Sequence, residues 1–526
     1  MRTLISLGLA MLILMVFNPS TIAQTIEAEK TYTITGKSKR GTLGDAFYDV
    51  DKKTYTLTYV TKTNDRKAKF QIYTFDYDFN FLDMTEDEIE FEKAKTKYKW
   101  FRYQGELYTT QGLYVEPNLT GTLVLREKKI THKFDWFFLG YYTTTEILQK
   151  VKPKTDDGRK YFYHSHAEDN VTGEATILVG IKDKMKKDAD PYSHFRNFVV
   201  MKVSQDVEIL SETSFSFDYP MTPVFARYIS DAQGGVGGMV FVFAPMGGPG
   251  MGKVADPNKN NYAYVRVDAN PNVVDNIRFD SYAPYWPVNE MVVDYSSDAV
   301  YLFGPSAMGK DKYYGQLLGT SKFKAVQLMK IADHKIEYFT ETDLPEFEAK
   351  LKKPADQKKA PAYEGKKFAF ANYKIASNGD FIVSGQRFKP SNEGNQYNDI
   401  VGFHFDSKGK LKAQYSVDTK ESNKYAKANG TEQFFTENTS STRMYWFQLE
   451  IVGVALAKGK MLSYPSIGYI DLSNDNISNF ISLGGEEGYY LDPSYPYLAT
   501  DGESKIVFFG SDRKGKEIWF ARVMLD

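Results

Sequence analysis

The chain has 526 residues, of which 42% are hydrophobic, 25% charged and 15% aromatic, and it contains no cysteine. Its formal net charge of -1 supplies no basic field for a phosphate backbone, which excludes nucleic acid as an expected partner. The absence of cysteine excludes disulfide frameworks, thiolate metal sites, iron–sulfur clusters and cysteine nucleophiles.

Residues 1–23 are typical of a secretory signal peptide. Arg2 provides a basic start, an apolar run follows at 4–17, and Thr21 to Ala23 form a small-residue cleavage pattern. The apolar run has 14 residues, fewer than the roughly 20 that cross a bilayer. We therefore expect cleavage after Ala23 and export to the periplasm or the exterior of a bacterium, with no membrane span in the mature chain.

A pair of strands recurs along the rest of the chain, as an apolar strand, a polar turn and a second, shorter strand. The first strands lie at 72–76, 123–125, 199–203, 264–268, 326–329, 401–406, 467–471 and 518–523. Second strands begin at 81, 130, 207, 336, 411 and 477. The copies follow one another at about 64 residues on average, which is the period of a repeat architecture.

A further apolar strand stands ahead of several copies and ends in glycine, at Gly180, Gly304, Gly385 and Gly510. Four strands per unit predict a β-propeller. The expected fold class is all-β, with one propeller of about eight four-stranded blades over residues 24–526, and seven blades as the alternative if the unit at Leu123 is irregular. Because the eighth copy lacks a second strand, we expect Thr31–Thr35 to pair with it and close the ring through both chain ends.

Two inserts are expected to carry short helices. Thr85 and Glu88 form a capping-box pattern that opens an acidic segment in the insert 84–97. Thr342 to Glu346 begin a second helix in the insert 342–367, which continues as a stretch rich in Lys, Pro and Ala that we expect to be mobile. We interpret both inserts as solvated connectors, with a docking surface for a partner as the alternative.

The last repeat resembles a known family. Residues 497–508 contain an Asp-Gly turn before an apolar strand, and Ser511-Asp512-Arg513-Lys514-Gly515 precede Ile518-Trp519. This order looks like the TolB-type, WD-like propeller repeat, and residues 378–385 are a looser second example. The resemblance covers about a tenth of the chain and implies a fold rather than an activity. The Gln after the cleavage site, with high Lys and Tyr content, is similar to exported proteins of the Bacteroidota.

Signals for metals and phosphates are weak. His164 and His166 lie two residues apart on a predicted strand, which places both imidazoles on one face with Glu168 as a third ligand. Since no other His or Cys stands nearby, we interpret them as ordinary polar residues and expect neither a metal nor a cofactor. Residues 247–253 match part of a phosphate loop, but Val254 and the residues after it cannot open the helix that would hold a phosphate.

The best candidate for a binding site is a set of aromatic residues beside prolines. They lie in segments that lead from a fourth strand into the next blade, and they are Tyr219, Tyr282, Tyr285, Trp286, Tyr490, Tyr495 and Tyr497. In a propeller such connections converge on one face around the central channel, where flat rings stack on sugars or hold a peptide. The alternative is that Pro and Tyr pack the entry of each inner strand.

These observations favour an exported, non-enzymatic, monomeric propeller that binds a protein or a cell-envelope polymer. The alternative is a hydrolase or lyase that acts on a glycan or peptide at the channel mouth, since propeller carboxylates come from different blades and cannot be paired from sequence. Two carboxylates about 5–10 Å apart in an aromatic-lined channel would favour the enzyme. A buried Tyr285 and Trp286 beside an uncharged channel mouth would count against it.

Overall fold

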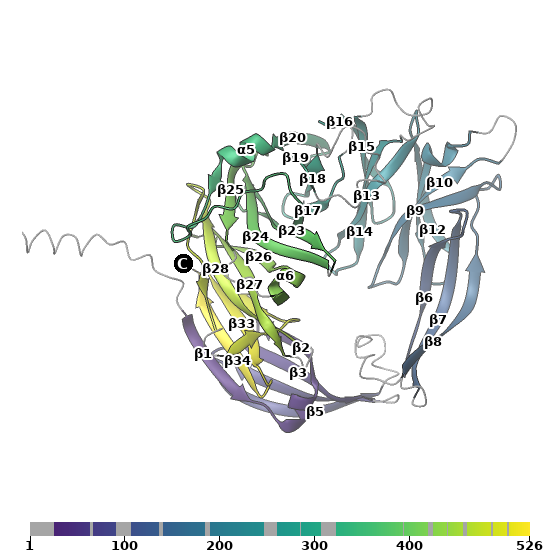
Figure 1. Ribbon diagram of the computed structural model, residues 1–526. Helices are drawn as coiled ribbons and strands as arrows, with labels where there is room; N and C mark the ends of the chain where they lie inside the picture. The colour runs from purple at the N-terminus through teal and green to yellow at the C-terminus, as the bar shows by residue number, and fades with distance from the viewer. Residues whose placement is uncertain are drawn as a thin grey trace, which may run out of the picture.

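The computed structural model describes residues 26–63, 67–90, 107–135, 140–184, 190–246, 260–283, 286–306, 322–392, 394–418, 424–438, 440–455, 460–484, 488–501 and 504–525. Eight sheets follow one another in chain order around a ring (Figure 1). The prediction of a single propeller of eight blades is confirmed. The predicted signal peptide lies outside the described residues. Within the ranges given, no helix is long and apolar enough to cross a bilayer.

The first half of the chain forms blades 1 to 4. Blade 1 consists of β2 (Thr42–Asp49), β3 (Thr54–Thr63), β4 (Lys67–Asp76) and β5 (Phe81–Glu90), and blade 2 of β6 (Leu107–Pro117), β7 (Leu123–Asp135) and β8 (Gly140–Val151). Blade 3 consists of β9 (Lys160–Glu168), β10 (Ala175–Lys182), β11 (Asn197–Val203) and β12 (Ile209–Ser216), with the short helix η2 (Ser193–Phe195). Blade 4 consists of β13 (Met221–Ser230), β14 (Val236–Pro245), β15 (Asn261–Asp268) and β16 (Val273–Asp280).

The second half forms blades 5 to 8. Blade 5 consists of β17 (Glu290–Asp294), β18 (Ala299–Ser306), β19 (Ala325–Ala332) and β20 (Lys335–Asp343), followed by α5 (Leu344–Ala349). Blade 6 consists of β21 (Leu351–Lys352), β22 (Phe368–Ile375), β23 (Phe381–Ser391), β24 (Gly394–Phe405) and β25 (Leu411–Val417), followed by α6 (Lys424–Asn429). Blade 7 consists of β26 (Glu432–Asn438), β27 (Arg443–Ala455), β28 (Lys460–Asp471), β29 (Asn476–Ile477) and β30 (Ile481–Ser482). Blade 8 consists of β31 (Tyr489–Leu491), β32 (Tyr497–Asp501), β33 (Lys505–Asp512), β34 (Glu517–Met524) and β1 (Ile26–Thr33).

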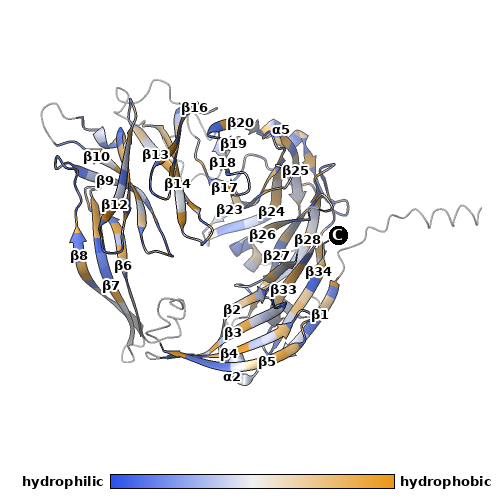
Figure 2. Cartoon of the chain, turned by 180° about the vertical axis from the view of Figure 1, so that it is seen from behind, coloured by the Kyte–Doolittle hydropathy of each residue, from blue (hydrophilic) through white to orange (hydrophobic). Residues whose placement is uncertain are grey.

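The inner strands of blades 3 to 8 are apolar on both faces because each of these blades packs between two others. In β18, Tyr301 and Phe303 join the cluster shared with blade 6, whereas Val300 and Leu302 join the cluster shared with blade 4. Successive side chains of a strand point to opposite faces, so both sets are buried. Figure 2 shows the result as hydrophobic segments along the strands of neighbouring blades.

A glycine within each of the strands β10, β18, β23 and β33 allows close approach of a neighbouring segment. A Cβ atom at these positions would lie 1.9 to 2.4 Å from a backbone carbonyl oxygen, at Gly180, Gly304, Gly385 and Gly510. No side chain fits at such a distance. The repeated glycine in the sequence is therefore a packing requirement of the blade.

Blade 8 is completed by the start of the chain, as predicted from Thr31–Thr35. Strand β1 pairs antiparallel with β34 from Ile26 opposite Val523 to Thr33 opposite Glu517, and Figure 1 shows the purple β1 beside the yellow β34. The indole Nε1 of Trp519 also donates a hydrogen bond to Glu29 Oε1 at 2.5 Å. Closure through both chain ends is confirmed.

Blade 2 departs from the predicted strand pair. Ile130 does not begin a second strand, because β7 runs without interruption from Leu123 to Asp135. The residues after Leu125 carry no turn former, and Arg126 and Lys128 form ion pairs with Glu116 of β6 instead. The unit at Leu123 is irregular, with three strands in the described residues.

The helix predicted at Thr85 is wrong, because this segment is the outer strand β5. Its acidic residues are neutralised across strands: Lys67 and Lys69 lie 2.6 and 3.0 Å from Glu88. Lys37 lies 2.8 Å from Glu86. Opposite charges on neighbouring segments stabilise a strand. The acidic residues of this segment therefore do not need a helix dipole to be accommodated. The remainder of the insert 84–97, after Glu90, lies outside the described residues.

The helix predicted from Thr342 is confirmed as α5. Asp343 caps it, since its side chain accepts a hydrogen bond from Glu346 N at 3.2 Å. The expectation that the following stretch is mobile is wrong, because β21 pairs with β25 and Tyr363 is fully buried. The Tyr363 hydroxyl donates to the Phe323 carbonyl at 2.7 Å. This packing fixes the insert against blades 5 and 6.

Candidate functional site

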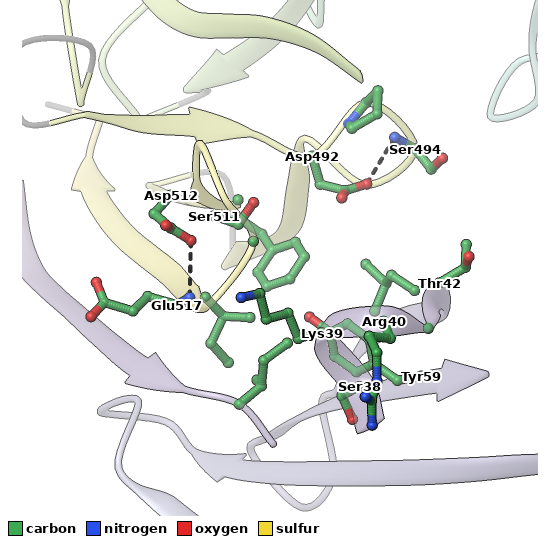
Figure 3. Close-up of a pocket in the computed structure, with 18 of the residues that line it drawn as sticks. Ser38, Lys39, Arg40, Thr42, Tyr59, Asp492, Ser494, Ser511, Asp512 and Glu517 are labelled. Atoms are coloured by element: carbon green, nitrogen blue, oxygen red, sulfur yellow. Dashed lines mark hydrogen bonds between the residues drawn. The ribbon is translucent and has the colours of Figure 1, made fainter. Parts of the chain in front are cut away.

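A pocket of about 660 Å³ opens where blade 8 meets blade 1. Three segments form it: residues 34–43 after β1, residues 492–494 before β32, and residues 509–518 around the turn between β33 and β34. In a four-stranded antiparallel blade, the turn between the second and third strands lies on the same face as the connections between blades. We call it the connection face and the opposite one the turn face. The pocket therefore lies on the connection face, at the closure of the ring (Figure 3).

The short helix α2 (Gly36–Arg40) forms one wall of the pocket. Thr35 caps it by accepting a hydrogen bond from Ser38 N at 3.3 Å, and the buried Ser38 hydroxyl donates to Gln71 Oε1 of blade 1 at 2.6 Å. The helix ends at Gly41, where a Cβ atom would lie 2.3 Å from the Val60 carbonyl oxygen. These contacts fix α2 against blade 1, so the side chains that it directs into the pocket have a rigid base.

The turn between β33 and β34 forms the opposite wall. Asp512 organises it, because its carboxylate accepts from the backbone N–H groups of Lys514, Lys516 and Glu517 at 3.2, 2.6 and 3.0 Å. The Glu517 carboxylate accepts from the Tyr489 hydroxyl at 3.1 Å. Both carboxylates are thus engaged in holding the turn.

The third wall is the segment before β32. Asp492 Oδ1 accepts from the backbone N–H groups of Ser494 and Tyr495 at 3.0 and 3.2 Å. Beside it, burial raises the pKa of Tyr59 well above its ordinary value, and the Asp492 charge adds to the shift. Tyr59 is therefore a neutral phenol at physiological pH.

Three basic residues line the pocket: Lys39 and Arg40 from α2 and Arg513 from the turn. Figure 3 shows Lys39 reaching from α2 across the pocket toward the turn that carries Ser511 and Glu517. Within the described part of the chain, neither Arg40 nor Arg513 forms an ion pair with a carboxylate. The sequence analysis missed Lys39, Arg40 and Asp492, and it singled out the turn at Ser511 only as a mark of a repeat.

The aromatic candidates between blades 4 and 5 lie in different environments. Trp286 is fully buried among residues of both blades, and its Nε1 donates to the Gly304 carbonyl at 3.3 Å. Tyr282 is 54% exposed, and its hydroxyl donates to the Phe339 carbonyl at 2.8 Å. Tyr285 lies outside the described residues. The Trp286 ring packs the blade junction, as the alternative interpretation of the aromatic set expects.

The other aromatic candidates are spread over three further junctions. Tyr219 packs between blades 3 and 4 and donates to Asn261 Oδ1 at 2.7 Å. Tyr495 packs between blades 8 and 1 and donates to the Gly44 carbonyl at 2.9 Å. Tyr490 is half-buried in β31, and Tyr497 is 41% exposed beside Phe434. The structure does not gather these rings into one surface.

The two histidines of β9 are separated by a β-bulge. Ser165 pairs with Leu178 and Tyr163 with Val179, which leaves His164 as the extra residue. His164 Nε2 lies 3.0 Å from the His194 carbonyl, whereas His166 Nδ1 lies 2.8 Å from the Tyr163 hydroxyl. Among the described residues, no three side chains of His, Asp or Glu are arranged to hold a metal ion.

Because the His164 imidazole is largely buried, we expect the protein to lose stability in mild acid. Burial lowers the pKa of this imidazole to about 4, so between about pH 6.5 and pH 4 the unfolded chain binds a proton that the folded protein does not. Stability should therefore fall over this window, by up to about 3 kcal/mol. Urea denaturation at pH 7.5 and 4.5 measures the loss, and His164→Gln should reduce it.

The matched control for this prediction is His166→Gln. His166 lies on the same strand but is partly exposed, and its Nε2 lies 3.4 Å from Glu168 Oε1. This variant should retain the acid sensitivity of the parent. An equal loss of stability in the parent and in His164→Gln would contradict the assignment.

No protein-family model matches the chain, and no curated protein matches it. Among solved structures, lignostilbene dioxygenase from Pseudomonas brassicacearum is 12% identical, with 89% of this chain and 92% of that chain covered and a TM-score of 0.27. An apocarotenoid oxygenase mutant from Synechocystis is 8% identical, with 88% and 94% covered and a TM-score of 0.28. A DUF4221 member from Bacteroides vulgatus is 9% identical, with 70% and 94% covered and a TM-score of 0.24. Likenesses this low carry no argument about chemistry in this chain.

Proposed function

We propose that the chain is an exported, non-enzymatic propeller that binds a protein or a cell-envelope component through the pocket at the junction of blades 8 and 1. The observation that carries the proposal is this pocket, whose 660 Å³ fall in the range of ligand sites. Its walls come from both ends of the chain, and each is anchored by hydrogen bonds of its own. A preorganised hollow of this kind suits recognition, because little ordering entropy is lost on binding.

The carboxylates of the pocket argue for binding over hydrolysis. Glycoside hydrolysis requires one carboxyl group that donates a proton and a second that attacks or activates water. Asp492 and Asp512 accept backbone hydrogen bonds, and Glu517 accepts one from a tyrosine. Such bonds hold these carboxylates in structural positions within the fold, which supports the non-enzymatic proposal.

Filling the pocket tests the proposal. Ser494 lies exposed on the third wall, so Ser494→Trp should occupy the pocket without disturbing a buried contact. Tagged wild-type protein and this variant are used for affinity purification from the native envelope, with mass spectrometry of the bound material. We expect at least one component whose recovery falls about tenfold or more in Ser494→Trp, a loss of about 1.4 kcal/mol or more in binding.

The control is Ser297→Trp, which adds the same side chain to an exposed turn between β17 and β18 on the turn face. Components that bind the pocket should be recovered by this variant as by the wild type. Thermal denaturation of both variants establishes that each is folded. Equal recovery of every component by all three proteins would refute the pocket as the binding site.

A further inference from the structure

We propose that the segment 190–196, which contains η2, is an acid-sensitive switch that opens when His164 and His194 take up protons. The segment belongs to the connection between β10 and β11, the second and third strands of blade 3, so it lies on the connection face. The inference goes beyond the proposed function and does not depend on it. It rests on how the two imidazoles are packed.

The segment is held closed by contacts with β9 and β10. Ser193 is 1% exposed, and its hydroxyl accepts a hydrogen bond from Asp183 N at 2.8 Å. The His194 carbonyl accepts a hydrogen bond from His164 Nε2 at 3.0 Å. A Cβ atom at Gly180 would lie 1.9 Å from the same carbonyl oxygen, so the segment packs directly on the backbone of β10. Opening of the segment therefore uncovers both imidazoles.

Aromatic rings surround the two imidazoles. The Phe162 ring lies 4.4 Å from the His194 ring and 5.3 Å from the His164 ring. The Phe195 ring lies 4.3 Å from the His194 ring and 5.4 Å from the His164 ring. Because apolar surroundings replace the water that would hydrate a charge, protonation of either imidazole is costly while the segment is closed.

The ring nitrogens add a second cost. His194 is 8% exposed, and within the described residues its buried Nδ1 has no hydrogen-bond partner. A neutral imidazole tolerates this arrangement, because one of its nitrogens carries no proton. In the protonated ring both nitrogens are donors, so Nδ1 would become a buried N–H group without an acceptor. His164 can gain a proton only at Nδ1, since its Nε2–H already donates to the His194 carbonyl.

The neighbouring charges do not offset these costs. The charged groups of the segment and of the strands against which it packs are Arg159, Lys182, Asp183, Asp190 and Arg196. The two aspartates are paired with the two arginines, at 3.3 and 3.1 Å. Burial lowers the pKa of both imidazoles to about 4, and repulsion by Lys182 adds to the shift at His194 despite the attraction of Asp190. The closed segment therefore keeps both imidazoles neutral above about pH 4.

The direction of the pH response follows from these pKa values. In the open segment each imidazole is hydrated and has its ordinary pKa of about 6.5. Between about pH 6.5 and pH 4 the open form binds protons that the closed form does not, so acid favours opening. At pH 5 each imidazole should raise the open population about 30-fold relative to pH 7.5, and the two together should raise it about 1000-fold.

Single cysteines can report the opening, because the chain contains no cysteine of its own. Ser193→Cys places a thiol in the segment, and Val200→Cys places one in the core of the same blade, where Val200 is fully buried. Labelling by 4,4′-dithiodipyridine is measured at pH 7.5 and pH 5, and each rate is divided by that of free cysteine at the same pH. We expect the normalised rate of Ser193→Cys to rise about 1000-fold and, at pH 5, to exceed that of Val200→Cys at least about 100-fold.

Two histidine variants in the Ser193→Cys background assign the protons. His194→Gln should reduce the rise to about 30-fold, because one imidazole remains. His166→Gln is the control on the same strand, where Nδ1 lies 2.8 Å from the Tyr163 hydroxyl, and it should respond like the parent.

Three results would overturn the switch. Equal normalised labelling of Ser193→Cys and Val200→Cys at pH 5 would mean that blade 3 unfolds as a whole. A rise in His194→Gln as large as in the parent would mean that other groups take up the protons. Labelling of Ser193→Cys at pH 7.5 as fast as that of free cysteine would mean that the segment is not closed.

Discussion

Deletion of residues 26–33 is expected to lower the free energy of unfolding by on the order of 5 kcal/mol or more, which is comparable to the whole stability of many domains. These residues form β1, the outer strand of blade 8, and their loss exposes the edge of β34. The Tyr32 ring also stacks on Phe81 of blade 1 at 4.6 Å. The strand therefore holds two blades together.

The effect is large because blade 1 has few other apolar contacts with its neighbouring blades. Tyr55, Leu57 and Tyr59 pack against blade 8, but the alternate residues Thr54 and Thr56 line the opposite face. Within the described residues, no buried cluster joins blades 1 and 2. Loosening the junction of blades 8 and 1 should therefore release blade 1 as a unit.

Urea denaturation followed by tryptophan fluorescence measures the change, since Trp519 contacts β1 directly. A synthetic peptide of residues 26–34 added in trans should restore stability, and a scrambled peptide should not. The control Lys30→Ala removes an exposed hydrogen bond to Asn80 and an exposed charge near Asp76, and it should cost less than about 0.5 kcal/mol. A truncated protein with parental stability would contradict closure by β1.

Asp380→Ala is expected to cost about 3–5 kcal/mol, the penalty for breaking a buried ion pair. The carboxylate is 4% exposed, and His404 Nε2 and Lys412 Nζ lie 2.8 and 3.0 Å from its Oδ2. Lys412 also lies 2.7 Å from Asp475 of blade 7. Removing Asp380 leaves the buried His404 Nε2 without its carboxylate partner and takes from Lys412 one of its two carboxylate partners, at the junction of blades 6 and 7.

The pH dependence gives a second readout. Burial opposes ionisation of Asp380, but the hydrogen bonds from His404 and Lys412 outweigh it and lower its pKa below the ordinary value. Its contribution is therefore present above about pH 4 and is lost as pH falls through the folded-state pKa. The difference between wild type and Asp380→Ala should shrink below about pH 4.

The control is Asp406→Ala, in a turn of the same blade, where an exposed carboxylate accepts from two backbone N–H groups. This change should cost about 1 kcal/mol. Equal costs for the two variants, or a difference from wild type that does not change with pH, would contradict the role of the buried network.

The sequence predicted the blade repeat because one physical requirement recurs in it. Strands covered on both faces must be apolar throughout, and the turns between them need residues that bond to the local backbone. An aspartate recurs at these turns, and its carboxylate accepts a hydrogen bond from the backbone N–H group two or four residues later in the chain. Examples are Asp231, Asp268 and Asp406. Such signals are local, so they can be read along the chain.

The errors came where a local pattern had two physical solutions. Thr85 to Glu88 suits a helix cap, but lysines of neighbouring segments neutralise the same charges in a strand. The polar run after Leu125 looked like a turn, but it lacks Gly, Pro, Asn and Asp, and ion pairs with Glu116 keep it extended. Both choices depend on residues across the sheet.

The pocket had no sequence signal because its walls are separated by almost the whole chain. Residues 34–43 and 509–518 come to line one pocket only when β1 closes the ring. The aromatic residues beside prolines could be recognised in the sequence, but in the structure they lie at several different blade junctions. Trp286 and Tyr495 pack the entry to the inner strands there. Aromatic and proline residues beside a strand are therefore better evidence for the start of that strand than for a ligand site.

The most direct test of the central claim, that the junction of blades 8 and 1 is a recognition site, is quantitative partner capture by wild type, Ser494→Trp and Ser297→Trp. The account predicts a component recovered equally by wild type and Ser297→Trp and reduced about tenfold in Ser494→Trp, a difference of about 1.4 kcal/mol. Recovery of the same components in the same amounts by all three folded proteins would contradict it.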